Sequence, residues 1–159
     1  MAEELNITAT TKEEKYLQLI PQIKSLLHGE TNEIANMANI CSALKYGMNF
    51  LWVGFYLVKN NELVLGPFQG PVACTRIAKG KGVCGKSWEK NEVLIVEDVN
   101  NFPGHISCSS LSLSEIVIPV YNSTGTITGV LDVDSDELAS FDSIDEKYLK
   151  MILSELFLN

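Results

Sequence analysis

Apolar residues recur at intervals of three and four positions in three stretches of the chain, a period that is typical of amphipathic helices. This pattern predicts helices over Lys12–Leu27, about Thr31–Tyr46, and Ser143–Leu156. Pro21 lies inside the first helix and is expected to kink or divide it, because proline cannot donate the helical hydrogen bond. Gly47 is expected to end the second helix.

The second and last helices carry more specific signals. The apolar stripe of the second helix is predicted to consist of Ile34, Met37, Cys41 and Leu44. Because cysteine packs as a small apolar side chain, we expect Cys41 to be a buried structural thiol. Ser143 and Glu146 have the spacing of a capping box and are predicted to start the last helix.

Short apolar or alternating stretches, typical of β-strands, occupy much of the middle of the chain. NFLWVGFYLV and ELVLG, joined by KNN, predict a hairpin. VLIVED, SEIVIPVY and TITGVLDVD predict three more strands, and the turn sequence NSTG joins the last two. Two helices, a run of mostly antiparallel strands and a final helix predict an α+β fold with the sheet packed on helices.

The segment between Gly66 and Asn91 has no clear period apart from a short predicted helix near Val83–Lys90. It contains five glycines and two of the four cysteines, Cys74 and Cys84. Long ordered loops in compact domains are usually functional. We therefore expect this segment to contribute to a site.

Composition limits the possible partners. With 159 residues, of which 46% are hydrophobic, residues 1–159 are predicted to form one globular domain. The net charge of −8 disfavours binding to nucleic acid or to anionic membranes. The N-terminal sequence lacks the apolar core of a signal peptide, so we predict a cytoplasmic protein. The four cysteines are then expected to be thiols rather than a disulfide framework.

Strand alternation groups the polar residues of the predicted sheet. Trp52 and Tyr56 share one face of their strand and could form the floor of a ligand pocket, or could be ordinary core aromatics. Glu115 points away from the apolar face of its own strand. Asp132 and Asp134 share a face, which is unfavourable for two like charges unless they are solvated or bind a ligand.

If these faces coincide, three carboxylates, two aromatic rings and nearby thiols line one pocket. Such a pocket suits an organic ammonium group beside aromatic rings. Calcium and magnesium are disfavoured because they prefer shells made only of oxygen. Zinc bound by Cys74, Cys84, Cys108 and His105 is an alternative, although the spacing matches no common structural zinc site.

Five motifs have a specific order and spacing: GPVACTRI, GKGVCGKSW, VEDV, FPGHISCSSLSLSEIVIPV and GVLDVDS. In these motifs, from about Trp52 to Phe141, the chain resembles the free methionine-(R)-sulfoxide reductases. That family is built on a GAF domain, so the resemblance implies a single GAF-like domain, in agreement with the α+β pattern. A GAF fold alone would not imply an enzyme, because GAF domains often only bind ligands.

The resemblance implies an oxidoreductase that acts on free L-methionine (R)-sulfoxide and functions in the oxidative stress response. In this family a thiolate attacks the sulfoxide sulfur, methionine leaves, and the cysteine sulfenic acid condenses with a second cysteine to an intramolecular disulfide. Thioredoxin then reduces the disulfide, with no bound cofactor or metal. A homodimer is also implied.

Carried over by position, the resemblance implies Cys108 as the nucleophile and Cys84 and Cys74 as recycling thiols. Trp52 and Tyr56 would contact the methyl-sulfoxide end of the substrate. The three acids, Glu115, Asp132 and Asp134, would bind the ammonium group, and Asp134 would protonate the departing oxygen.

Two questions stay open at the level of sequence. Cys84 lies near a helix start between Lys81 and Lys86, which would favour its thiolate, so Cys84 is an alternative nucleophile to Cys108. His105 could assist Cys108 or could be structural. Two other functional classes are a GAF sensor that binds a small ligand without turnover and a zinc-thiolate protein.

Overall fold

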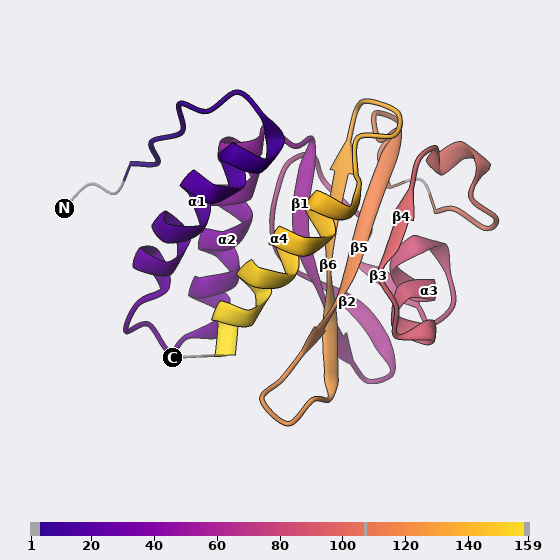
Figure 1. Cartoon of the computed structure of the whole chain (residues 1–159). Coiled ribbons are helices and arrows are strands. Elements are labelled where there is room, and N and C mark those ends of the chain that lie inside the picture. Colours follow the sequence, from indigo (N-terminus) through magenta and orange to yellow (C-terminus); the bar gives the residue numbers. More distant parts are fainter. Residues whose placement is uncertain (1–3, 107, 158–159) are drawn as a thin grey trace.

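The computed structural model describes residues 4–106 and 108–157 (Figure 1). Its helices are α1 (Lys12–Leu27), α2 (Glu33–Met48), α3 (Gly82–Lys90) and α4 (Ser143–Ser154), with short 3₁₀ turns at Val99–Asn101 and Glu155–Phe157. Its strands are β1 (Trp52–Lys59), β2 (Glu62–Gln69), β3 (Arg76–Ala78), β4 (Leu94–Val96), β5 (Ser114–Tyr121) and β6 (Ile127–Ser135).

The six strands form one antiparallel sheet in the order β3-β2-β1-β6-β5-β4. The predicted hairpin joins β1 to β2 through Asn60 and Asn61, whose φ angles of 49° and 62° are those of a two-residue turn that asparagine tolerates. The central strands β1, β6 and β5 carry the most apolar side chains. The predicted α+β fold with a mostly antiparallel sheet is confirmed.

The sheet separates two layers (Figure 1). Helices α1, α2 and α4 cover one face, where the larger apolar cluster contains residues such as Phe55, Ile116 and Leu131. Helix α3 and its neighbouring loops cover the other face, where a second cluster contains Trp52, Tyr56 and Cys84. Alternate residues of the same strands therefore enter two different environments.

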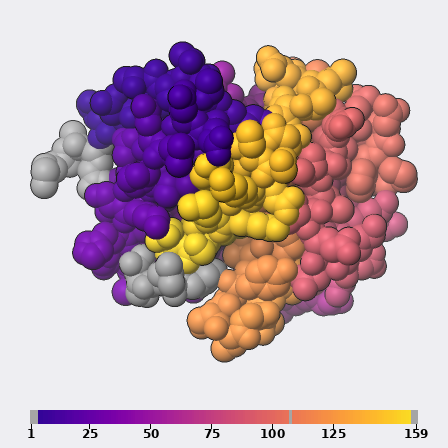
Figure 2. Space-filling model, viewed as in Figure 1, coloured from indigo at the N-terminus to yellow at the C-terminus, as the bar shows by residue number. Residues whose placement is uncertain are grey.

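The surface view shows α4 lying between the N-terminal helices and the region of β4 and α3 (Figure 2). Within residues 4–106 and 108–157, none of the helices combines the length and the apolar character needed to cross a membrane.

Two details of the helices at the N-terminus differ from the expectation. Pro21 does not divide α1 into two helices; it lies on the exposed side of the helix, where the carbonyl that lacks its donor can bind water. Gly47 does not end α2, which continues to Met48 and is capped by Asn49 at a φ of 61°. Gly47 instead allows close packing of the helices, since a Cβ there would lie 3.0 Å from a methyl group of Leu19.

Other local details also differ. Ile34 is 64% exposed and does not belong to the apolar stripe of α2, whereas Cys41 is fully buried as expected. The capping box of α4 is formed one residue earlier than predicted, by Asp142 and Asp145. The apparently irregular segment after Gly66 contains the end of β2 and the short strand β3. With three residues, β3 is too short for its alternation of apolar and polar side chains to be recognised in the sequence.

Candidate active site

Trp52 and Tyr56 of β1 form an aromatic wall on the α3 side of the sheet. Their ring centroids lie 6.1 Å apart, and Trp52 also stacks on Phe68 of β2 at 5.5 Å. Gly54 makes this arrangement possible, because a Cβ at that position would lie 2.1 Å from the Trp52 ring. The glycine between the two aromatic residues is thus required by the position of the indole.

The aromatic wall also holds the loop that carries Cys74. The indole Nε1 of Trp52 donates a hydrogen bond to the carbonyl oxygen of Pro71 at 3.0 Å. The hydroxyl of Tyr56 donates to the carbonyl oxygen of Cys74 at 2.9 Å. Both polar tips of these partly apolar side chains are therefore satisfied by loop backbone, which fixes the loop relative to β1.

The three predicted acids lie next to each other on two paired strands. Glu115 of β5 is directly opposite Asp134 of β6, and Asp134 is in turn opposite Trp52 of β1. Glu115 and Asp132 are buried, with 6% and 7% of their surface exposed, and Asp134 is partly buried. The interpretation of the aspartate pair as a merely solvated strand end is excluded for Asp132.

Burial of three like charges changes their ionisation. Desolvation, followed by the negative charges of Asp132 and Asp134, raises the pKa of Glu115 well above its usual range. Desolvation and the charge of Asp134 do the same to the pKa of Asp132. At neutral pH the cluster therefore retains protons that exposed carboxyl groups would have lost.

Asp134 differs from the other two acids because its hydrogen-bond donor is a hydroxyl group, that of Ser112, and not the thiol of Cys84. Desolvation raises its pKa to about 6, while the hydrogen bond that it accepts from the hydroxyl of Ser112 opposes this rise. A carboxylic acid with a pKa close to neutral can donate a proton and regain it within one catalytic cycle. The environment of Asp134 thus suits a general acid.

One oxygen of Asp132 has no hydrogen-bond partner among the residues that the structure describes. Its Oδ1 atom is buried and makes no hydrogen bond within the described part of the chain. Because burial of an unpaired polar atom is costly, such an atom is a reason to expect a ligand. The donors that would satisfy it are an ammonium group or a cation.

The structure brings two of the three predicted redox cysteines together. Cys74 and Cys108 form a disulfide between residues 34 positions apart in the sequence, with their Cα atoms 5.4 Å apart. Cys84 remains a free thiol on α3, and its Sγ lies 3.8 Å from Oε1 of Glu115. The two kinds of sulfur therefore have different neighbours: the disulfide belongs to the loops, and the thiol to the acid cluster.

The expectation that the surroundings of Cys84 favour its thiolate is wrong. Burial, and after it the negative charges of Asp132 and Glu115, raise the pKa of the Cys84 thiol well above its usual range. Lys86 does not contact the thiol, since its Nζ atom donates to the carbonyl oxygen of Pro103 at 2.6 Å. These surroundings favour the protonated thiol of Cys84 over its thiolate.

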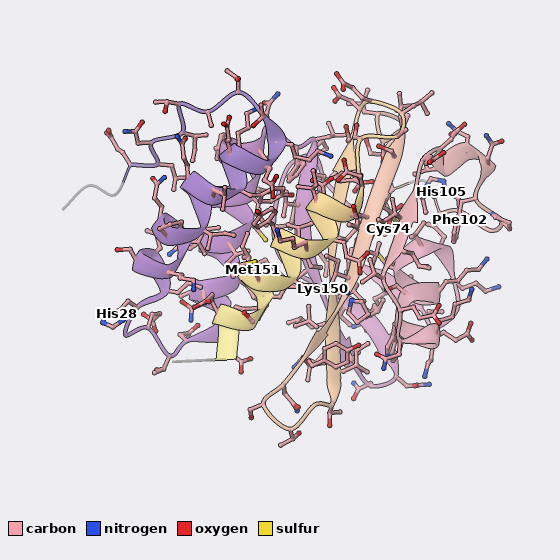
Figure 3. The ribbon with its side chains drawn as sticks, viewed as in Figure 1. His28, Cys74, Phe102, His105, Lys150 and Met151 are labelled. Atoms are coloured by element: carbon pink, nitrogen blue, oxygen red, sulfur yellow. A yellow bond between two sulfur atoms is a disulfide. The ribbon has the colours of Figure 1, made fainter. Side chains whose placement is uncertain are left out.

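The zinc site considered from the sequence does not form as proposed, because Cys74 and Cys108 are bonded to each other. His105 lines the same cavity, and partial burial lowers its pKa. Figure 3 shows Cys74, His105 and Phe102 on the α3 side of the sheet, away from Lys150 and Met151 of α4.

Seven of the eight predicted residues of the site line one cavity, and they are Trp52, Tyr56, Cys84, Cys108, Glu115, Asp132 and Asp134. The eighth, Cys74, does not line the cavity but is bonded to Cys108, which does. The cavity combines an aromatic wall, a buried acidic floor and a disulfide at its edge. It can hold a small cationic molecule next to sulfur chemistry.

Two functional side chains were not predicted from the sequence. Ser112 is one of several serines before β5, and nothing in their pattern indicates which one binds Asp134. Phe68 follows a proline in β2, and its stacking on Trp52 depends on the pairing of Gly54 with Phe68. Both contacts join segments that are distant in sequence.

Comparisons with known proteins show which proteins the chain is similar to. No protein-family profile matches the chain. GAF domain-containing protein A of Dictyostelium discoideum is 64% identical over 157 residues, which cover 98% of this chain and 99% of that protein. The free methionine-R-sulfoxide reductase of Escherichia coli (strain K12) is 44% identical over 147 residues, which cover 91% of this chain and 88% of that protein.

Among solved structures, the free methionine-R-sulfoxide reductase from Neisseria meningitidis, in complex with its substrate, matches with a TM-score of 0.93 at 48% identity. The match covers 98% of this chain and 93% of that one. The predicted GAF-like fold is confirmed by this likeness.

Proposed function

The chain belongs to the family of free methionine-R-sulfoxide reductases, and on this premise we propose that it reduces free methionine (R)-sulfoxide to methionine by thiol chemistry. The observation that carries the proposal is the Cys74–Cys108 disulfide beside a cavity with a buried acidic floor. A disulfide is the product that sulfoxide reduction by two thiols leaves behind.

The first step takes place at Cys108. Its thiolate attacks the sulfoxide sulfur and takes over the oxygen, so that the substrate gains two electrons and leaves as methionine while Cys108 becomes a sulfenic acid. The oxygen needs a proton as the S–O bond of the substrate breaks. Asp134 supplies it, which is supported by its pKa of about 6.

The second step forms the disulfide. The Cys74 thiol displaces the hydroxyl group of the Cys108 sulfenic acid, an S–S bond forms, and water leaves. The Cα separation of 5.4 Å supports Cys74 as this partner. Cys84, which is not in the disulfide, keeps the role of a recycling thiol as a prediction for later exchange with the reductant.

Substrate recognition follows from the acids and the aromatic rings. The ammonium group is bound by Glu115 and Asp132, whose unpaired Oδ1 would accept one of its hydrogens. Trp52 and Tyr56 contact the methyl-sulfoxide end of the substrate, because aromatic rings make favourable contacts with methyl groups and with polarisable sulfur. An amine that is acylated carries no charge and would leave the acids unpaired.

Thioredoxin is the proposed electron donor, since a surface thiolate is needed to open the disulfide by exchange and no bound cofactor is required. The requirement for reduced cysteines supports a cytoplasmic location. A homodimer is proposed on the base rate of symmetric assembly among soluble proteins.

The experiment is a coupled assay in which NADPH oxidation is followed with thioredoxin, thioredoxin reductase and the separate epimers of methionine sulfoxide. Free methionine (R)-sulfoxide should be turned over, and the N-acetyl compound should react roughly 10⁴-fold less efficiently, because the buried acids lose their partner. Comparable efficiency on the N-acetyl compound would contradict an enzyme for the free amino acid. Binding of either epimer without turnover would instead support a GAF sensor.

A further inference from the structure

Cys84 is a buried nucleophilic group that the first two chemical steps do not use. It lies on α3 and is 3% exposed, and its sulfur contacts the acid cluster rather than the disulfide. An ammonium group can be bound by Glu115 and Asp132 without any sulfur. The thiol beside these two acids adds a type of ligand atom that an ammonium group does not use.

The donor atoms of the three side chains converge. The sulfur of Cys84 and one carboxylate oxygen each of Glu115 and Asp132 lie within 4.8 Å of one another, and all three residues are buried. In a tetrahedral zinc site the bonds are about 2.0–2.3 Å long, so neighbouring ligand atoms are roughly 3.3–3.8 Å apart. Small side-chain rotations would bring the three atoms to that spacing.

A second observation also points to a ligand at this position. Oδ1 of Asp132 is buried and has no hydrogen-bond partner among the described residues. No cationic side chain of the described residues forms an ion pair with any of the three ligands. The cluster thus has unpaired acceptor capacity that a cation would fill.

From this convergence we propose that Cys84, Glu115 and Asp132 form a binding site for a thiophilic divalent cation, with zinc as the expected ion. Binding replaces the proton of the Cys84 thiol and any proton held by Glu115 or Asp132, so that sulfur–metal and oxygen–metal bonds form and these protons are released. Sulfur and carboxylate ligands are typical of zinc, whereas calcium and magnesium prefer oxygen alone. Three protein ligands leave the fourth position open to solvent or substrate.

The consequence for activity rests on the proposed function. If the substrate ammonium is bound by Glu115 and Asp132, the ion and the amino acid compete for the same oxygens. Zinc would then be an inhibitor of the reductase rather than a cofactor. Free methionine, which cannot oxidise the protein, should displace the ion.

The disulfide makes a clean binding experiment possible. In the oxidised protein Cys74 and Cys108 are blocked, so only Cys84 and Cys41 are free. Cobalt(II), added alone as the probe, should bind with one equivalent and give a thiolate-to-cobalt charge-transfer band that zinc abolishes. Cys41→Ser is the matched control, since Cys41 is also buried but its sulfur donates a hydrogen bond to the carbonyl oxygen of Pro67, away from the acid cluster.

The proposal predicts that the band is lost in Cys84→Ser and kept in Cys41→Ser. Asp132→Asn and Glu115→Gln keep the thiol and should each weaken or abolish the band, which protects the test if Cys84→Ser fails to fold. Zinc should also raise the melting temperature of the oxidised parent, because it binds the folded state. Absence of the band in the parent, or its persistence in Cys84→Ser, would overturn the site.

Turnover is measured separately in chelator-treated enzyme, so the two hypotheses fail independently. An active reductase without the band keeps the proposed function and overturns the metal site. A protein that gives the band but shows no turnover keeps the metal site and overturns the proposed function. A band that methionine does not diminish would overturn the competition between ion and amino acid.

Discussion

The two faces of the central strands present opposite chemistry from adjacent residues. On β6, Leu131 and Val133 point to the helices α1, α2 and α4, and both are fully buried in the larger apolar cluster. Asp132 and Asp134 of the same strand point to α3 and form the floor of the cavity. One strand therefore serves two functions by alternation alone.

The difference shows how stability and function are divided in this fold. The apolar face gains free energy of folding by removing apolar surface from water. The acidic face loses free energy at neutral pH, because desolvation and mutual repulsion raise the pKa of each carboxyl group. The acids lower the stability of an otherwise well-packed sheet, and a ligand that binds them would offset this loss of free energy.

The largest expected effect is that of removing one acid, because this should slow the chemical step without lowering the stability of the fold. Asp134→Asn keeps the shape of the side chain but cannot donate a carboxylic proton, so the reductive step should slow by about 10²–10⁴-fold. Single-turnover methionine formation in metal-free buffer measures this, and thermal melting is the control. The variant should melt at or above the temperature of the parent, because a buried charge is gone. Unchanged kinetics in a folded variant would show that Asp134 is not the acid.

A substitution on the apolar face of the same strand should instead lower stability and leave the chemical step unchanged. Leu131→Ala leaves a cavity in the apolar cluster and should lower the free energy of unfolding by roughly 2–5 kcal/mol. The chemical step of the folded fraction should be retained, since Leu131 faces away from the site. Urea denaturation and single-turnover kinetics at low temperature test both points. A large loss of the chemical rate in folded protein would mean that the two faces are not independent.

The pH dependence of stability should reveal the acidic face. A carboxyl group whose pKa is raised by folding contributes stability that is present below its unfolded pKa and is lost as the pH rises through its folded pKa. For Asp134 this window extends from 3.8 to about 6, and Glu115 and Asp132 extend it upward. The free energy of unfolding of the oxidised protein should therefore fall from about pH 4 to about pH 6 and continue to fall above pH 6.

Urea titrations at several pH values measure this dependence, with Asp134→Asn as the control that should reduce the slope. A stability that rises over the same interval in the parent would indicate that the acids are ionised and paired in the folded protein.

The smallest expected effect concerns Ser112, a positioning residue for the acid. Ser112→Ala removes the hydrogen bond that stabilises the ionised form of Asp134, so the pKa of Asp134 should rise above about 6. Carbon-13 shifts of the aspartate carboxyl groups, followed with pH in the oxidised protein, measure the change. Ser112→Thr should restore the parent value. A pKa that stays the same or falls in Ser112→Ala would contradict this role.

Much of this organisation is predictable from the sequence because alternation is a local property. The period of two in WVGFY, SEIVIPV and GVLDVDS places the aromatic residues and the acids on one face, and the structure confirms that face. The bounds of α1 and β5 also follow from local pattern and match the structure.

The errors and omissions depend on contacts between distant segments. The sequence suggests a thiolate at Cys84 because it shows the nearby lysines. It does not show the burial of this thiol against Asp132 and Glu115, which raises its pKa. The pairing of Cys74 with Cys108, the contact of Ser112 with Asp134 and the stacking of Phe68 on Trp52 all join separate elements. The alternation of residues within one segment contains no information about which distant segments come into contact.

The most direct test of the account is a single turnover of the fully reduced protein with free methionine (R)-sulfoxide and no added reductant. The parent should form about one equivalent of methionine and the Cys74–Cys108 disulfide, which mass spectrometry of peptides identifies. Cys74→Ser should still form one equivalent and retain a trappable sulfenic acid on Cys108, whereas Cys108→Ser should form none. A stoichiometric burst from Cys108→Ser, together with its loss in Cys84→Ser, would contradict the account and assign the attack to Cys84.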